Sequence, residues 1–232
     1  MKAWPIVAAA VVVAGAIGLL VLFGVANDQP APSAETAPTV AAQDAVIVTE
    51  KVPKGAASAT FAGGCFWCTE SAFQELPGVS NAISGYAGGT EYNPSYRDVY
   101  TESTGHREAI RVYYDPKQIS YDELLDVYWR TIDPTDAGGQ FVDRGMSYTT
   151  AVFYENERQR KAAERSKAAL DESGRFDEPV VTEILPFTTF YQAEDYHQDF
   201  YKKSSQRYEQ YSEASGREEF KERVWEAIEE GS

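Results

Sequence analysis

The stretch "SATFAGGCFWCTESAFQEL", residues 58–76, predicts a short strand that runs into two glycines and then a helix that begins at a cysteine. Apolar residues over 66–76 recur at helical spacing, and a Pro-Gly pair follows directly. Cys65 is therefore expected at the N-terminus of a helix, on a tight turn from strand to helix.

The elements that follow extend this unit into one α+β domain. We expect strands over 79–86, 107–115 and 148–154, a helix over 121–132 with Ser120 and Glu123 as a capping box, and a terminal helix over 217–230. Long polar loops separate several of these elements. The order β-α-β-β-α-β over 58–155 predicts a ferredoxin-like (split βαβ) two-layer sandwich with a mixed sheet, helices and C-terminal extensions.

The first 26 residues have the character of a membrane or export segment. No residue from 3 to 26 is charged, and the apolar run is long enough as a helix to cross the roughly 30 Å core of a bilayer. Two interpretations stay open: a single N-terminal anchor in the cell membrane, or a signal cleaved near Gly24 and Ala26 that leaves a secreted or periplasmic protein. Lys2 on the N-terminal flank places the rest of the chain outside the cytoplasm.

Residues 27–56 are rich in Ala, Pro and Thr and predict a flexible linker before a globular domain at 57–232. The net charge of the chain is −15, and residues 1–56 contribute only −1 because three lysines oppose four carboxylates. The domain therefore carries −14, which argues against nucleic acid as a partner.

The only two cysteines, Cys65 and Cys68, form a C-x-x-C pair with several possible uses. Zinc normally needs three or four protein ligands, and only His106 and His197 are available besides the pair, so no metal is expected. A structural disulfide would close a two-residue loop and stabilise the fold little.

A reactive pair agrees best with the expected position of the two cysteines. The positive end of the helix dipole favours the Cys65 thiolate, and Cys68 lies on nearly the same helical face, where it can attack an oxidised Cys65. Phe66 and Trp67 form an apolar wall beside the nucleophile. General thiol-disulfide exchange on partner proteins stays open, as does an anchored binding module with an incidental disulfide.

Seven segments in order give a specific resemblance over about residues 57–211. They are "GCFWCTE" followed by "LPGV", "SGYAGG", "NPSYRDV", "TGHREA", "YDPKQISYDELL", "DPTD" with "GGQFVDRGMSY", and "AEDYHQDFY". The chain resembles the peptide-methionine (S)-S-oxide reductases, the A-type methionine sulfoxide reductases. The resemblance implies an enzyme that reduces the S-epimer of methionine sulfoxide, either free or in oxidised peptides and proteins.

The resemblance implies a thiol mechanism without metal or organic cofactor. Cys65 would attack the sulfoxide sulfur, and Glu108 would protonate the departing oxygen. The Cys65 sulfenic acid would then condense with Cys68, and an external thioredoxin-like or dithiol reductant would reduce the disulfide.

The resemblance also assigns residues to substrate binding. Tyr96 and Tyr148 would donate hydrogen bonds to the sulfoxide oxygen, Phe66 and Trp67 would hold the ε-methyl group, and Asp143 would position the substrate. His106 and His197 are expected to hydrogen-bond behind these residues.

The chain departs from the commonest family pattern at one functional position. Many members have glycine where Cys68 stands and carry the resolving cysteine in a C-terminal tail. Here the chain after residue 211 contains no cysteine.

Overall fold

The computed structural model describes residues 46–48 and 52–226, and the predicted membrane or export segment and most of the predicted linker lie outside this range. Within the described residues, no helix combines the length and the apolar character that a membrane crossing requires. The α+β class with a mixed sheet is confirmed.

The strands of the large sheet are β1 (Val46–Ile47), β2 (Ala57–Gly63), β3 (Val79–Ala87), β4 (Arg107–Tyr114), β7 (Thr150–Tyr154), β8 (Glu183–Pro186) and β9 (Phe190–Gln192). The main helices are α1 (Phe66–Gln74), α2 (Tyr96–Tyr100), α3 (Tyr121–Thr131), α4 (Glu157–Glu172), α5 (Phe200–Lys203), α6 (Ser205–Ala214) and α7 (Arg217–Lys221). The predicted order β-α-β-β-α-β is present as β2-α1-β3-β4-α3-β7, with α2 added in the loop before β4.

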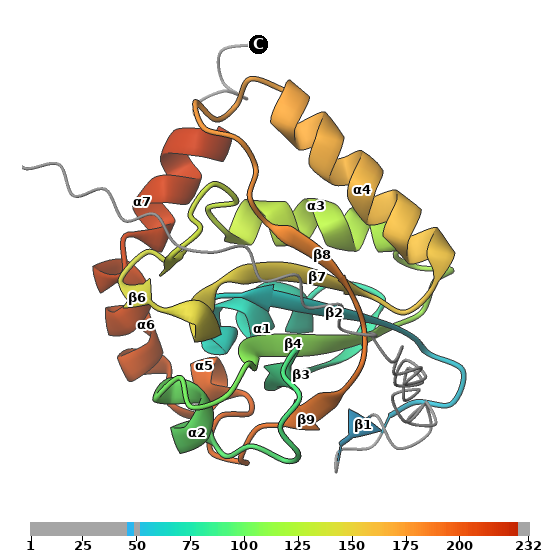
Figure 1. Ribbon diagram of the computed structural model, residues 1–232, viewed down its shortest axis with the longest axis vertical. Helices are drawn as coiled ribbons and strands as arrows, with labels where there is room; N and C mark the ends of the chain where they lie inside the picture. The colour runs from blue at the N-terminus through green and yellow to red at the C-terminus, as the bar shows by residue number, and fades with distance from the viewer. Residues whose placement is uncertain (1–45, 49–51, 227–232) are drawn as a thin grey trace, which may run out of the picture. The chain divides into compact units, whose positions relative to one another are not determined.

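The sheet order is β1-β9-β3-β4-β2-β7-β8. The four central strands β3, β4, β2 and β7 pair antiparallel with one another, whereas β7 pairs in parallel with β8. The register pairs Phe61 of β2 with Ile110 of β4 and with Val152 of β7. β2 is thus a central strand that ends at Gly63, and the chain passes from there through Gly64 and Cys65 into α1 (Figure 1).

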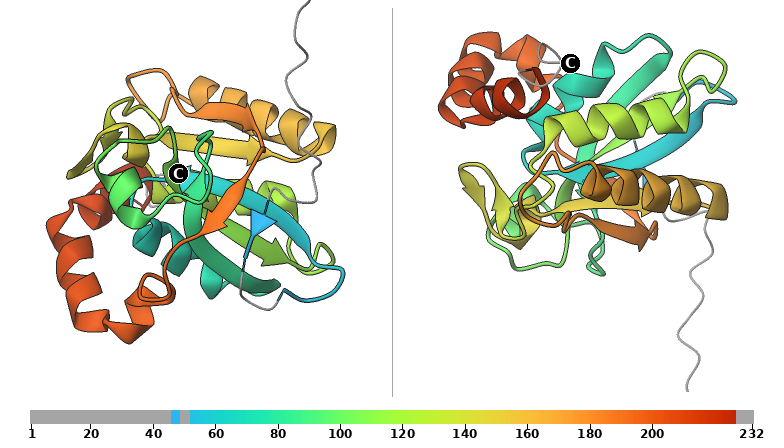
Figure 2. Two further views of the ribbon diagram at one scale, coloured as in Figure 1. Left: turned by 60° about the horizontal axis from the view of Figure 1, so that its bottom comes forward. Right: turned by 90° about the horizontal axis from the view of Figure 1, so that it is seen from above.

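The core lies mainly between the sheet and the helices α1, α3 and α4, which cover one face (Figure 2). Side chains alternate along β4: Ile110 and Val112 join this core, whereas Ala109 and Tyr113 join a smaller cluster on the opposite face. The larger core fixes the orientation of α1 and therefore of the residues at its first turn.

The helix starts follow the sequence closely. Ser120 caps α3, its hydroxyl accepts from the Glu123 N–H, and the Glu123 carboxylate accepts from the Ser120 N–H at 2.7 Å, so the predicted capping box is confirmed. Cys65 is the N-cap residue of α1, as the glycine-to-cysteine turn predicted.

Two regions differ from the sequence-based expectation. Val46–Ile47, inside the predicted flexible linker, pair in parallel with Phe190–Tyr191 because β9 would otherwise offer an open strand edge. The terminal helix expected over 217–230 begins at Arg217 as α7 and changes to a π-helical turn at Glu222–Glu226, and residues 227–230 lie outside the described range.

Candidate active site

The turn that presents Cys65 depends on the two glycines before it. Gly64 has a φ of +77°, a region that favours glycine, and a Cβ there would lie 2.5 Å from Cβ of Gln140. The chain can therefore leave β2 and begin α1 within two residues, which sets Cys65 at the head of the helix with only 6% of its surface exposed.

A cavity of about 160 Å³ opens at this turn and gathers residues from six separate segments of the chain. Its lining consists of Cys65, Phe66, Trp67, Tyr96, Tyr100, Glu108, Asp143, Tyr148 and Tyr211. The tertiary structure thus brings together every predicted residue expected to touch substrate. Two further tyrosines complete the lining.

Glu108 is the buried carboxyl group of this cavity. Only 3% of the residue is exposed, and burial raises its pKa to about 8, although the Phe66 N–H donates a 2.9 Å hydrogen bond to Oε2. Desolvation therefore outweighs the backbone donor, which alone would favour the carboxylate. Glu108 is protonated at neutral pH and can give a proton to a bound group.

Tyr96, which precedes Glu108 in the sequence, and Tyr148, which follows it, bring phenol groups to the same cavity. Burial raises the pKa of both above the usual tyrosine range, so both keep their O–H donors at physiological pH. Tyr148 is also hydrogen-bonded to the Glu108 carboxyl group. Phenols held in this way can stabilise negative charge on an oxygen atom in the cavity.

The two cysteines are both buried, reduced thiols, and they interact. A hydrogen bond from Cys65 lowers the pKa of Cys68 to about 7, whereas burial raises the pKa of Cys65. The expectation that the helix N-terminus favours the Cys65 thiolate is therefore wrong for the structure as it stands, because burial disfavours the charged form of the thiol. A hydrogen bond from Tyr211 acts in the opposite direction and favours the Cys65 thiolate.

Phe66 and Trp67 differ in their exposure and surroundings. Phe66 is fully buried and belongs to the main core as well as to the cavity. Trp67 stacks on Phe200 with 3.8 Å between ring centroids, and its indole N–H donates to Nδ1 of His197 at 3.1 Å. The wall beside Cys65 is thus rigid on both sides.

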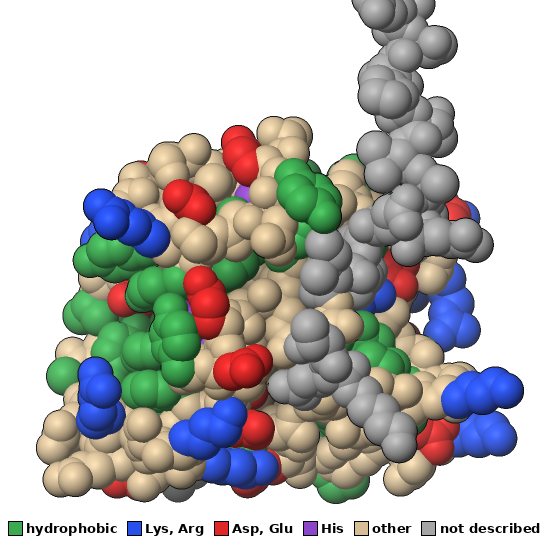
Figure 3. Space-filling view, turned by 90° about the horizontal axis from the view of Figure 1, so that it is seen from below, with side chains coloured by type: hydrophobic (Ala, Val, Ile, Leu, Met, Phe, Trp, Pro, Cys, Tyr) green, Lys and Arg blue, Asp and Glu red, His purple; other side chains and the backbone are tan. Residues whose placement is uncertain are grey.

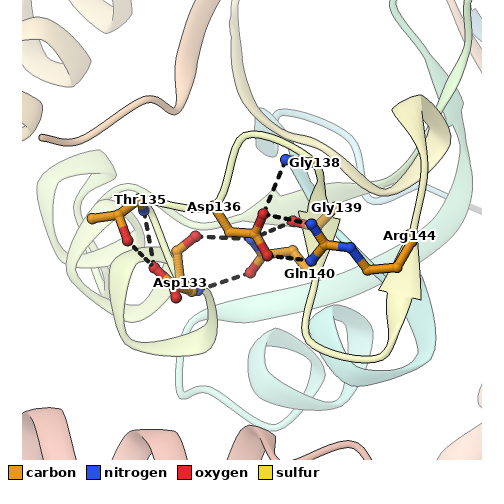
Figure 4. Close-up of polar contacts among 7 residues, drawn as sticks. All are labelled: Asp133, Thr135, Asp136, Gly138, Gly139, Gln140 and Arg144. Carbon is orange, nitrogen blue, oxygen red and sulfur yellow. Dashed lines mark hydrogen bonds and ion pairs between the residues drawn. The ribbon is translucent and has the colours of Figure 1, made fainter. Parts of the chain in front are cut away.

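Asp143 reaches the cavity from the short strand β6 (Asp143–Arg144), which pairs with β5 (Gly139–Gln140). Figure 4 shows the polar contacts of neighbouring residues that hold this loop. The Gln140 side chain accepts from the Asp133 N–H and donates to the Asp133 carbonyl, both at 2.8 Å, and Arg144 pairs with Asp136. Between these contacts, the Asp143 carboxylate accepts a hydrogen bond from the Tyr211 phenol. The loop therefore holds Asp143 against a helix that lies almost 70 residues further along the chain.

The two histidines lie in different surroundings. His197 contacts the rings of Phe66 and Tyr96, and burial lowers its pKa to about 4, so it is a neutral acceptor for Trp67. His106 is not part of the lining: Nδ1 accepts from the Gly89 N–H, and Nε2 contacts the Glu91 carbonyl at 2.9 Å. His197 supports the cavity wall directly, whereas His106 orders the loop before β4.

Tyr100 and Tyr211 line the cavity, but sequence reasoning did not identify them. Nothing in the sequence distinguishes them among 15 tyrosines, and Tyr211 comes from α6, beyond the part of the chain where the strand order sets neighbours. Tyr100 is 59% exposed and lines the cavity, so it marks the cavity mouth. Figure 3 shows hydrophobic side chains gathered between charged ones on one face of the molecule.

A larger hollow of about 490 Å³ lies elsewhere and contains neither cysteine. Its charged groups are already paired, Arg107 with Glu183 and Asp136 with Arg144. In the described part of the chain, no cluster of His, Cys, Asp and Glu side chains has the size needed to hold a metal ion. The reactive groups are gathered in the smaller cavity, which is lined by a thiol, a neutral carboxylic acid and four phenols.

Comparison with known proteins agrees with this geometry. Residues 57–229 match the family model described as peptide methionine sulfoxide reductase. The peptide methionine sulfoxide reductase MsrA of Listeria innocua serovar 6a is 56% identical over 167 residues, which cover 72% of this chain and 94% of the relative. That of Bacillus subtilis strain 168 is 52% identical over the same shares of the two chains.

Solved structures show the same relationship. The reduced form of Mxr1 from Saccharomyces cerevisiae is 30% identical with a TM-score of 0.64, over 68% of this chain and 91% of Mxr1. Methionine sulfoxide reductase A of Corynebacterium diphtheriae is 33% identical with a TM-score of 0.59, over 66% and 77% of the two chains. The chain therefore belongs to the peptide methionine sulfoxide reductase family, as an oxidoreductase of the A type.

Proposed function

We propose that this chain reduces the S-epimer of methionine sulfoxide through Cys65, with Glu108 as the acid. The observation that carries the proposal is the shared cavity, in which the Cys65 thiol and a carboxylic acid protonated at neutral pH face the same space. A sulfoxide oxygen leaves poorly as an anion, so a neutral acid beside the nucleophile is the group that the reaction needs.

In the first step, the Cys65 thiolate attacks the sulfoxide sulfur and Glu108 gives its proton to the oxygen. A transient bond forms between the Cys65 sulfur and the methionine sulfur, whose oxygen is now a hydroxyl group. The hydroxyl oxygen then leaves the methionine sulfur and bonds to the Cys65 sulfur while the sulfur–sulfur bond breaks, so methionine is released and Cys65 becomes a sulfenic acid. Two electrons pass from the thiolate to the methionine sulfur. The interaction with Tyr211 favours the Cys65 thiolate, against the effect of burial, while it reacts.

The sulfoxide oxygen and the methyl group of the substrate contact different residues of the cavity. Tyr96 and Tyr148 donate hydrogen bonds to the oxygen as negative charge develops on it. Phe66 and Trp67 enclose the methyl group, and Asp143, held by Tyr211, orients the rest of the substrate. The exposed ring of Tyr100 at the mouth suits a peptide-bound as well as a free methionine sulfoxide.

In the second step, Cys68 attacks the sulfur of the Cys65 sulfenic acid and releases water, which leaves a Cys65–Cys68 disulfide. An external thioredoxin-like or other dithiol donor reduces that disulfide and completes the cycle. The lowered pKa of Cys68 supports its role as the attacking thiol in this step, because the thiolate is the species that attacks.

A single-turnover experiment tests these roles. Fully reduced protein mixed with the separate S- and R-epimers of methionine sulfoxide, without any reductant, should release about one methionine per protein from the S-epimer alone and lose both thiols. Cys65→Ser should release none. Cys68→Ser should release one methionine and accumulate a trappable sulfenic acid.

Each opposite result has a specific meaning. Release of no methionine by the reduced protein would exclude this function and leave general thiol-disulfide exchange. Full thioredoxin-dependent turnover by Cys68→Ser would remove Cys68 from the cycle while leaving Cys65 in place.

From the apolar run at residues 3–26, we also propose that the catalytic domain works outside the cytoplasm, behind an N-terminal anchor or a cleaved signal. Amino-terminal sequencing of the mature protein from membrane and soluble fractions separates the two forms. A full-length chain recovered from the cytosol would contradict both.

For the fold, we propose that β2-α1-β3-β4-α3-β7 is a split βαβ unit extended at both edges. The antiparallel order β7-β2-β4-β3 supports it.

A further inference from the structure

The C-terminal helices bring a buried arginine to the turn that carries the two cysteines. Arg217 of α7 is only 2% exposed, its NH1 group donates to the Thr131 carbonyl, and its guanidinium carbon lies 4.5 Å from the centroid of the Phe141 ring. Its Nε–H has no hydrogen-bond partner among the described residues. A buried guanidinium with an unused donor is costly unless it meets negative charge during the reaction.

The position of Arg217 relative to the cysteines is set by Gly64. A Cβ at Gly64 would lie 3.4 Å from the NH2 group of Arg217, so the guanidinium packs directly behind the residue that precedes Cys65. Cys68, three residues after Cys65 and 4% exposed, lies within the electrostatic reach of this charge. Arg217 does not line the substrate cavity.

Several groups act on Cys68 besides Arg217. The hydrogen bond from Cys65 has the largest effect and, like Arg217, lowers the pKa of Cys68, whereas burial and the charges of Asp143 and Glu218 raise it. Tyr208 of α6 also faces Cys68, and burial raises the pKa of this tyrosine to about 12, so the phenol stays protonated. Arg217 therefore supplies the positive charge in a site that otherwise holds two carboxylates.

We propose that Arg217 is a positioning residue for the resolving step: it stabilises the Cys68 thiolate that attacks oxidised Cys65. This inference rests on the proposed function, in which Cys68 is the resolving thiol. In that step a sulfur–sulfur bond forms between Cys68 and Cys65, the sulfur–oxygen bond of the sulfenic acid breaks, and the hydroxide takes up a proton and leaves as water. No further oxidant or reductant is needed, because the sulfenic sulfur is the oxidant and the thiolate is the reductant.

The C-terminal part of this chain contains no cysteine, but through Arg217 it would still take part in the resolving step. After residue 211 the chain supplies no thiol, but it supplies the cation beside the second thiol of α1. The resolving chemistry is thus divided between two segments: the sulfur comes from α1 and its electrostatic support from α7.

The test follows the two steps separately in fully reduced protein mixed with free methionine (S)-sulfoxide. Methionine release reports the first step, and trapping of the sulfenic acid against disulfide formation reports the second, from about pH 6 to about pH 9. The variants are Arg217→Met, which removes the charge, and Arg217→Lys, which keeps it. Arg175→Met is the matched control, because Arg175 also donates to a backbone carbonyl, that of Val224, and lies over an aromatic ring, that of Trp225.

We expect Arg217→Met to form the disulfide about tenfold more slowly near pH 7 and to need a pH about one unit higher for its half-maximal rate. Methionine release should change by less than about twofold, because its barrier depends on other groups. Arg217→Lys should restore most of the second rate, and Arg175→Met should match the unaltered protein. Should Arg217→Met fail to release methionine, Arg217→Gln takes its place, since the amide retains a donor for Thr131 without the charge.

Disulfide formation by the charge-free variant with the unaltered rate and pH profile would overturn the inference, as would equal slowing in Arg217→Met and Arg217→Lys. Absence of the disulfide in the unaltered protein would instead refute the role of Cys68 in the proposed function.

Discussion

The backbone N–H of Phe66 donates a hydrogen bond of 2.9 Å to Oε2 of Glu108. This contact joins β4 to the first turn of α1, immediately after Cys65, and so holds the Glu108 carboxyl group close to the proposed nucleophile. Two opposing effects act on the pKa of Glu108: the Phe66 N–H favours the carboxylate, while burial favours the protonated form. Burial prevails, and the consequences are measurable.

Replacement of the acid should change both the rate and its pH dependence. In the unaltered protein, methionine release should fall as pH rises through about 8, where Glu108 loses its proton. Glu108→Gln should slow methionine release by about 10²- to 10³-fold and lose this decline. Stopped single turnovers across pH measure both effects. Glu91→Gln, a change at an exposed carboxylate, should leave the profile as it is, and a retained decline in Glu108→Gln would remove Glu108 as the acid.

Glu108 should also make folding stability depend on pH. Its pKa is about 8 in the folded protein against 4.5 ordinarily, so between these values the folded state binds more protons than the unfolded state. The contribution of Glu108 to the free energy of unfolding is therefore full below about pH 4.5 and is lost as pH rises through about 8. Urea unfolding at several pH values should show this decline, and Glu108→Gln should flatten it. An equally steep decline in the variant would mean that other groups cause it.

The tyrosine phenols of the cavity should contribute unequally to the rate of methionine release, because their surroundings differ. Tyr148→Phe removes a donor that also contacts Glu108, and we expect methionine release to slow by about 10²-fold. Tyr96→Phe should slow it by a similar or smaller factor. Tyr100→Phe is the control, because its ring lies at the exposed mouth and should lose little. Equal rates in Tyr148→Phe and the unaltered protein would exclude an oxygen-binding role for that phenol.

The glycine turn before the nucleophile should resist substitution for a specific reason. Gly64→Ala should lower the free energy of unfolding by about 2–4 kcal/mol, since it combines a positive φ with a contact against Gln140. Gly174→Ala has a similar φ of +67° but no atom within 4 Å of the new Cβ, so about 1 kcal/mol is expected. Equilibrium denaturation measures the difference. Equal losses in both variants would mean that contact with Gln140 is unimportant.

Local sequence signals predicted where the helices α1 and α3 begin. The capping box at Ser120 and Glu123 and the helix that starts at Cys65 depend on residues within four positions of one another, so they are visible in the chain itself. The pairing of Val46–Ile47 with β9 was not predicted, because it joins segments about 140 residues apart and has no local signature.

The ionisation of the cysteines could not be obtained from position along the helix. The N-terminus of α1 predicted a favoured Cys65 thiolate, but burial raises the pKa of Cys65. Burial depends on how the whole domain closes around the turn, and in particular on α6 and α7, which come from the other end of the chain.

The sequence by itself determined the order of the central strands and helices and the family, and it predicted the proposed reacting groups, because these depend on residue identity and local spacing. Only the tertiary structure decided that Glu108 is a neutral acid beside Cys65, that Tyr211 supports the thiol and Asp143, and that Arg217 lies behind Cys68. These properties arise from desolvation and from charges held a few ångströms apart, and both depend on distances through space rather than along the chain.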